Sequence, residues 1–228
     1  MTPAREETPR LTLGWMQNPV RGLLHGSAAV VSIAGAILLW QRAAGNRPYQ
    51  VALLVFGLSL VALYTASSLY HTVPWRAHWK GRMQRLDHAM IYVLVAGTYT
   101  PVAGIVLDGR LRWAALAVVW GVALAGIVQK VWWPAVGSWL SVSLQTLQGW
   151  FAILLLAPLM ERLPGPALAL GALGGILYTA GMVVFVTQRP RLWPHVFSYH
   201  EVFHVLVVGG SLAHYAMIFG YVAALGPV

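Results

Sequence analysis

Seven long apolar blocks run through the sequence, and their length limits what the chain can fold into. Most of them hold about 20 residues, enough to cross the hydrocarbon core of a bilayer as an α-helix. Short polar stretches separate the blocks, which are Leu23–Trp40, Tyr49–His71, Leu86–Leu107, Trp113–Val131, Trp139–Leu156, Ala167–Thr187 and Tyr199–Leu225. We therefore expect an all-α integral membrane protein, a bundle of seven transmembrane helices. Residues 1–19 are expected to form a short polar N-terminal tail, and residues 20–228 the transmembrane domain.

The composition argues against a soluble domain and excludes thiolate chemistry. Only 9% of the 228 residues are charged, whereas soluble domains have about a quarter. A net charge of +9 can indicate nucleic-acid binding, but here the basic residues lie in short loops between apolar blocks, as membrane topology signals do. No nucleic-acid partner is therefore expected. The chain has no cysteine, so any metal must bind histidine, carboxylate or hydroxyl ligands.

The distribution of basic residues predicts how the helices are oriented. With seven spans, ten of the 15 Lys and Arg residues fall on the side of the N-terminus: Arg5, Arg10, Arg21, Arg76, Lys80, Arg82, Arg85, Lys130, Arg189 and Arg191. Because Lys and Arg are enriched in cytoplasmic loops, we expect a cytoplasmic N-terminus and a C-terminus outside. The first apolar block is too long for the apolar region of a signal peptide, so no cleaved signal is expected.

Two histidines interrupt the last apolar block. His200 and His204 are four residues apart, so they lie on one helical face, one turn apart. Neutral imidazole is the commonest metal ligand, and a pair with this spacing can bind one ion. His71 ends the second block and falls at the same depth, near the inner leaflet. We therefore predict that His71, His200 and His204 hold a zinc ion, because three histidines with an open fourth position are typical of catalytic zinc.

Two more polar residues are predicted at this depth. Asp87 lies at the start of the third block, and Ser67 precedes His71 by one helical turn. An ionisable residue within the membrane is costly and by default marks a function. Asp87 is therefore predicted to be a general base for water at the open metal position, and Ser67 to orient that water. The alternatives are a salt bridge between Asp87 and Arg85, a Ser67 hydroxyl that bonds to its own backbone, and an interfacial His71.

The segment from His200 to His204 also matches the HExxH pattern of zinc metalloproteases. Intramembrane metalloproteases usually carry this pattern in an early helix, so a protease is the weaker interpretation. Glu201 is expected either near the metal or against the inner headgroups. His214 lies about 15–20 Å from His200 along the helix axis, so we expect a hydrogen-bonded packing residue. His25, His78 and His195 are expected at the interface or in loops. His88 is expected on the surface, with a supporting position beside the metal ligands as the alternative.

Three motifs, taken in this order, resemble the hemolysin III branch of the progestin/adipoQ-receptor superfamily. They are Ser67–His71, then Leu86-Asp87-His88 running on to Ala96–Pro101, and His200-x-x-x-His204 followed by Val207–Ser211 and His214. The resemblance implies a seven-helix fold in a bacterial inner membrane and a zinc site near the inner leaflet, with Ser67 and Asp87 close to the metal-bound water. This sequence departs from the family where an acidic residue often precedes a histidine in the first helix. Here that region contains Gln17, Asn18, Arg21 and His25, without an acid.

Several functions are compatible with these residues. The resemblance implies relatives that are hormone receptors, lipid amidases similar to alkaline ceramidases, and bacterial proteins named for haemolysis and tied to membrane homeostasis. The first hypothesis is a zinc-dependent hydrolase that cleaves a lipid amide or ester. The second is a non-catalytic lipid sensor or receptor-like regulator with a structural zinc, so a membrane lipid is the expected partner in both. A pore-former and a bis-histidine haem protein are further alternatives, although no span shows the polar stripe of a water-filled channel.

Overall fold

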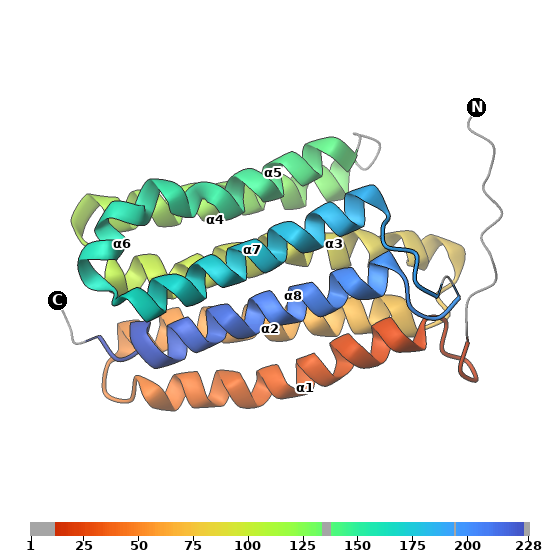
Figure 1. Cartoon of the computed structure of the whole chain (residues 1–228), viewed down its shortest axis with the longest axis horizontal. Coiled ribbons are helices and arrows are strands. Elements are labelled where there is room, and N and C mark those ends of the chain that lie inside the picture. The colour runs from red at the N-terminus through yellow and green to blue at the C-terminus, as the bar shows by residue number, and fades with distance from the viewer. Residues whose placement is uncertain (1–11, 134–137, 194, 226–228) are drawn as a thin grey trace.

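The structure is a computed structural model that describes residues 12–133, 138–193 and 195–225. In these ranges it is a bundle of long helices without a β-strand. Seven helical spans in it are long and apolar enough to cross a membrane, which confirms the predicted all-α, seven-span fold. The helices run roughly along one common direction (Figure 1). In chain order they are α1 (Pro19–Arg42), α2 (Arg47–Thr72), α3 (Ala77–Pro101), α4 (Gly109–Trp132), α5 (Ser138–Trp150), α6 (Leu156–Arg162), α7 (Gly165–Thr187) and α8 (Tyr199–Met217).

Three of the spans contain a change of helix type. The π-helical turn Val102–Val106 extends α3, and a second π-helical turn, Ile218–Val222, extends α8. A 3₁₀ turn, Phe151–Leu155, joins α5 to α6 within the fifth span. In all three the backbone remains helical, because a backbone exposed to hydrocarbon must satisfy its own hydrogen-bonding groups.

The ends of the helices follow local sequence signals. Proline stands in the first turn of α1, α2 and α7, where its missing N–H would have no helical partner in any case. The Asn46 side chain accepts a hydrogen bond from the backbone N–H of Tyr49 and so caps α2. Ser198 and Glu201 form a reciprocal capping box that starts α8 at the end of the bundle where two predicted metal ligands lie.

One boundary prediction was wrong, and the error has a physical cause. The third block was expected to start at Leu86, but α3 begins nine residues earlier, at Ala77. The span from Ala77 to Val106 has 30 residues, about 45 Å at 1.5 Å per residue, which exceeds a hydrocarbon core of about 30 Å. The first turns of α3 are polar and exposed, with Lys80 and Arg82 among them. The length of an apolar block predicts only the part of a helix that lies in the hydrocarbon core, and it does not predict polar helical turns that extend beyond that core.

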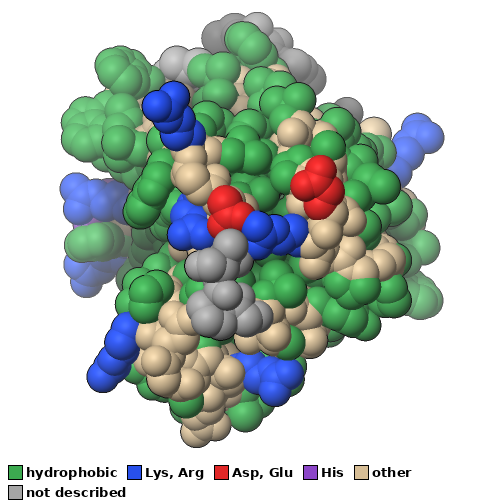
Figure 2. Space-filling view, turned by 90° about the vertical axis from the view of Figure 1, so that its left-hand side faces the viewer, with side chains coloured by type: hydrophobic (Ala, Val, Ile, Leu, Met, Phe, Trp, Pro, Cys, Tyr) green, Lys and Arg blue, Asp and Glu red, His purple; other side chains and the backbone are tan. Residues whose placement is uncertain are grey.

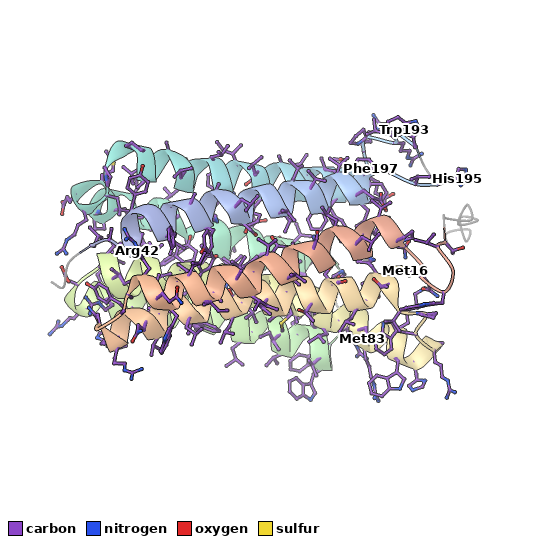
Figure 3. The ribbon with its side chains drawn as sticks, turned by 90° about the horizontal axis from the view of Figure 1, so that it is seen from below. Met16, Arg42, Met83, Trp193, His195 and Phe197 are labelled. Atoms are coloured by element: carbon purple, nitrogen blue, oxygen red, sulfur yellow. The ribbon has the colours of Figure 1, made fainter. Side chains whose placement is uncertain are left out.

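The two ends of the bundle differ in their chemistry. Met16, Met83 and Phe197 lie at one end and Arg42 at the other (Figure 3). Figure 2 views the Arg42 end, where a few charged side chains stand on a largely hydrophobic surface. Asp108, in the connection between α3 and α4, forms ion pairs there with Arg112 and Arg162. The opposite end gathers the start of α1, the end of α2 and the starts of α3 and α8, and it holds the site described next.

Candidate metal centre

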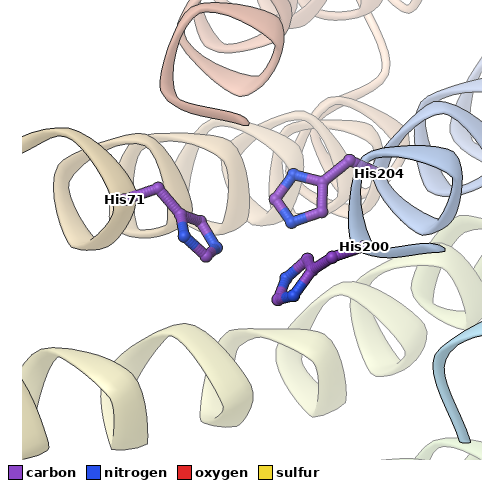
Figure 4. A group of neighbouring side chains, drawn as sticks. All are labelled: His71, His200 and His204. Carbon is purple, nitrogen blue, oxygen red and sulfur yellow. The ribbon is translucent and has the colours of Figure 1, made fainter. Parts of the chain in front are cut away.

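The three histidines predicted as ligands lie together at one end of the bundle. His71 is in the last turn of α2, and His200 and His204 are in the first two turns of α8. Each offers one ring nitrogen, and these three atoms lie within 4.8 Å of one another. The ring centroids are 5.1 Å apart for His71 and His200, 5.0 Å for His71 and His204, and 4.9 Å for His200 and His204. Figure 4 shows the rings converging on the space between α2 and α8.

The geometry of the three rings fits a metal ion. Bonds of about 2.0–2.1 Å to a tetrahedral zinc ion set ligand nitrogens about 3.3–3.4 Å apart. The rings therefore need to approach one another by at most about 1.5 Å, which small side-chain rotations provide. His204 is 1% exposed and His71 is 3% exposed, so an ion held between these rings would be shielded from bulk water. The group can thus hold a metal ion.

Asp87 and Ser67 lie beside the three histidines, as the helix register suggested. The Oδ2 atom of Asp87 is 4.0 Å from the Nε2 atom of His71, and both side chains are buried. The Ser67 side chain forms a hydrogen bond with the Asp87 carboxyl group. The alternative partner, Arg85, donates instead from its Nε to the backbone oxygen of Gly81 at 3.2 Å. The arrangement places a carboxylate from α3 beside a histidine group, built from α2 and α8, that could hold a metal ion.

Glu201 has a role that the sequence left open. Its Oε1 atom is 2.6 Å from the Nε of Arg21 on α1, and its Oε2 accepts a 2.8 Å hydrogen bond from the backbone N–H of Ser198. Both members of this ion pair are buried, with 3% of Glu201 and 6% of Arg21 exposed. Glu201 therefore anchors α8 to α1 and caps α8. From the sequence alone, Arg21 was interpreted only as a membrane topology signal, because its partner Glu201 lies 180 residues further along the chain.

The position predicted for His25 was wrong. It was expected at the interface or in a loop, yet it is buried on α1. Its ring stacks on that of His204, with centroids 3.9 Å apart and an angle of 24° between the planes. His25 lies one helical turn after Arg21, and this i,i+4 spacing on α1 was the available signal. The sequence could not show that α1 packs beside α8.

His214, His78 and His195 agree with their predicted places, whereas His88 is more buried than a surface residue. His214 lies 3.2 Å through its Nε2 from the backbone oxygen of Gly171 on α7, which confirms a hydrogen-bonded packing residue. His78 and His195 are exposed, and His88 is partly exposed. Between His204 and His214, the Ser211 hydroxyl accepts a 2.6 Å hydrogen bond from Tyr64 and lies 2.8 Å from the Tyr178 hydroxyl. The three hydroxyl groups therefore provide hydrogen-bond partners for one another inside the bundle.

Comparison with known proteins places the chain in a family. The family model described as Haemolysin-III related matches residues 13–215. The chain is 34% identical over 219 residues to "Hemolysin-3" of Bacillus cereus, covering 95% of this chain and 97% of that protein. It is 34% identical over 201 residues to "Hemolysin-3 homolog" of Bacillus subtilis (strain 168), covering 87% and 91%. Human "Monocyte to macrophage differentiation factor" is 24% identical over 208 residues, covering 86% of this chain and 81% of that protein.

The chain therefore belongs to the haemolysin-III-related family, which confirms the resemblance read from its motifs. Together with the seven spans, the bacterial relatives identify a multi-pass bacterial membrane protein.

Proposed function

We propose that the chain is a zinc-dependent membrane hydrolase that cleaves an amide or ester bond of a lipid. The observation that carries the proposal is a buried carboxylate beside a three-histidine group: Asp87 Oδ2 lies 4.0 Å from His71 Nε2. The chain has no cysteine, so imidazole and carboxylate are the strong ligands it offers. Three histidines suit zinc and leave one position for a reactant. We propose His71, His200 and His204 as the ligands.

The depth of the site supports a lipid substrate. His71 is the second-last residue of α2 and His200 the second residue of α8, so the group sits at the ends of two spans. At that depth the apolar interior of a bilayer meets the headgroups, and the ester and amide linkages of lipids lie in this region. A lipid can therefore present its carbonyl group to the site without leaving the membrane.

The chain's own residues supply proton transfer and orientation. When bound, zinc acts as a Lewis acid that polarises a carbonyl group and makes water a stronger nucleophile at neutral pH. The Asp87 carboxylate would accept a proton from the attacking water and return it to the leaving nitrogen or oxygen of the lipid. Ser67 holds the carboxylate by its hydrogen bond. The products are a fatty acid and an amine or an alcohol.

The second candidate is a non-catalytic lipid sensor or regulator in which zinc is structural. One observation favours it: the three donors come from α2 and α8, so an ion would tie the second span to the last one. In this case the zinc stabilises one arrangement of the helices, and a lipid would act by favouring or opposing that arrangement.

Turnover by matched variants separates the two candidates. The zinc-loaded protein in nanodiscs is incubated with a ceramide and with a glycerophospholipid, and released fatty acid is measured by mass spectrometry. We expect Asp87→Asn to keep its zinc and to lose about 10²- to 10⁴-fold in turnover, the usual contribution of a general base. Ser67→Ala should keep zinc and lose about 10-fold or more, because it leaves the carboxylate without its hydrogen-bond partner.

His204→Ala should lose both zinc and turnover. If the zinc-loaded wild type releases no fatty acid from an extended panel of lipid amides and esters, the structural role replaces the catalytic one. Wild-type turnover by Asp87→Asn would show that Asp87 is not the base.

A further inference from the structure

We propose that the start of α1 positions the metal-binding histidines. Asn18, Arg21 and His25, which we call the α1 clamp, join α2 and α8 at the candidate metal centre and hold their histidines close enough for small side-chain rotations to bring them onto one ion. The inference rests on the metal site of the proposed function and adds residues that are not ligands. Three independent contacts carry it, one to the backbone of α2, one to the start of α8 and one to a ligand ring.

The contact to α8 is the buried ion pair. Arg21 Nε lies 2.6 Å from Glu201 Oε1, and Glu201 stands between the two ligands His200 and His204 in the sequence. The second carboxylate oxygen accepts a hydrogen bond from the N–H of Ser198 at 2.8 Å. One carboxylate is thus fixed both by α1 and by the first turn of its own helix. A charge-assisted bond away from water is strong and directional, so it sets the position of the start of α8 relative to α1.

The contact to α2 runs through the backbone. The last carbonyl groups of a helix have no partner within the helix. Here the N–H of Gln17 donates to the carbonyl oxygen of Thr72 at 3.2 Å, and the N–H of Asn18 donates to that of His71 at 3.0 Å. The residue that presents one proposed ligand is therefore hydrogen-bonded directly to the segment that enters α1. The Ser68 hydroxyl adds a 2.8 Å bond to the carbonyl oxygen of Gly22.

The third contact orients a ligand ring. His25 stacks on His204 with centroids 3.9 Å apart, and it meets the Tyr64 ring edge-on at 5.0 Å. Both ring nitrogens of His25 are buried without a hydrogen bond of normal geometry to the described residues. Its contribution is therefore the flat face that fixes the plane of the His204 imidazole. A phenyl ring can provide the same face but cannot bind a metal.

Zinc affinity in matched variants tests the inference. Glu201→Gln removes the charge and retains an acceptor for the Ser198 N–H, because glutamine also serves in a capping box. We expect Glu201→Gln and Arg21→Gln each to weaken zinc binding about 10- to 100-fold in a chelator competition, the usual effect of losing a group that supports a ligand. The double variant should bind zinc no more weakly than the single variants, because the two residues act as one pair. His25→Phe should stay within about threefold of wild type, and His25→Ala should lose about 10-fold.

Helix spacing in zinc-free protein gives a readout that needs neither metal nor turnover. The chain has no cysteine, so spin labels attach at Leu69→Cys on α2 and Val205→Cys on α8, two exposed positions close to the site. We expect a narrow distance distribution in the wild-type background and a broader or displaced one with Glu201→Gln. Arg21→Lys, which keeps the charge, should remain closer to the wild-type distribution than Arg21→Gln.

Two results would overturn the inference. The first is zinc affinity within about twofold of wild type for Glu201→Gln and Arg21→Gln together with unchanged label distances. The second is loss of zinc from His25→Phe as complete as from His204→Ala, which would make His25 a ligand. A wild-type protein that binds no zinc would remove the proposed function and the positioning of metal ligands with it, whereas a zinc-binding wild type without turnover would remove the catalytic role alone and leave the clamp testable by zinc affinity and label distances.

Discussion

Zinc should stabilise the folded protein, and the His204→Ala substitution should remove most of that effect. A ligand present at 100 times its dissociation constant stabilises the state that binds it by about 2.7 kcal/mol. For chains of 150–250 residues, each kcal/mol raises the melting temperature by about 2–4 °C. We therefore expect the melting temperature of the wild type to be about 5–11 °C higher in zinc than in EDTA. The 11 tryptophans allow the transition to be followed by intrinsic fluorescence.

The expected loss in the variant follows from the ligand set. Structural zinc sites bind with about 10–16 kcal/mol, or roughly 2.5–4 kcal/mol for each of four ligands. Removing one ligand then weakens binding by about 70-fold or more. At the same free zinc concentration His204→Ala is at most about 60% occupied, which corresponds to at most about 0.5 kcal/mol and a rise of at most about 1–2 °C. Each variant is compared with itself in zinc and in EDTA, so the cavity left by the substitution cancels.

His214→Ala is the matched control. His214 lies on α8 ten residues beyond His204, about 15 Å along the axis, and its ring contacts the Gly171 carbonyl. Its loss should lower both melting temperatures and leave their difference unchanged. The reasoning is refuted if His204→Ala keeps the full zinc-dependent rise, or if His214→Ala loses it.

Packing and topology give two further predictions. In Gly126→Ala the new Cβ would lie 2.4 Å from Cζ of the fully buried Tyr92, so we expect overpacking to cost about 1–3 kcal/mol and the melting temperature to fall. In Gly121→Ala on the same helix the new Cβ would meet no atom within 4 Å, so this variant should be neutral or more stable by up to about 1 kcal/mol. Equal melting temperatures for the two variants would contradict the packing of α3 against α4. If the N-terminus is cytoplasmic, a membrane-impermeant maleimide should label Arg110→Cys and spare Lys80→Cys in intact cells. The opposite labelling would invert the proposed orientation.

The sequence was sufficient for the spans and for the shared depth of the three histidines. Both follow from one constraint, because a backbone in lipid must satisfy its own hydrogen bonds and an apolar block of about 20 residues does so as a single helical span. Alternating spans then bring the end of the second block and the start of the last one to the same side of the membrane. His71 is therefore level with His200 and His204 before any packing is known, and the structure places the three rings within reach of one ion.

The surroundings of the histidines could not be predicted in the same way. Arg21 and Glu201 are 180 residues apart, and their pairing requires α1 to lie beside α8, which depth alone does not decide. Basic residues near the end of an apolar block are usually topology signals, so Arg21 gave no reason to expect a buried partner. His25 was misassigned for the same reason, since its partner His204 lies across that helix contact. Lateral neighbours come from packing, and hydropathy does not report packing.

The central claim is that His71, His200 and His204 bind one zinc ion. The most direct measurement is the zinc content of the wild type, His71→Ala and His204→Ala by inductively coupled plasma mass spectrometry. The three proteins are expressed with zinc in the medium and purified without chelators. We expect about one zinc per wild-type chain and little or none in either variant. A wild-type protein without zinc, or variants that retain as much zinc as the wild type, would contradict the claim.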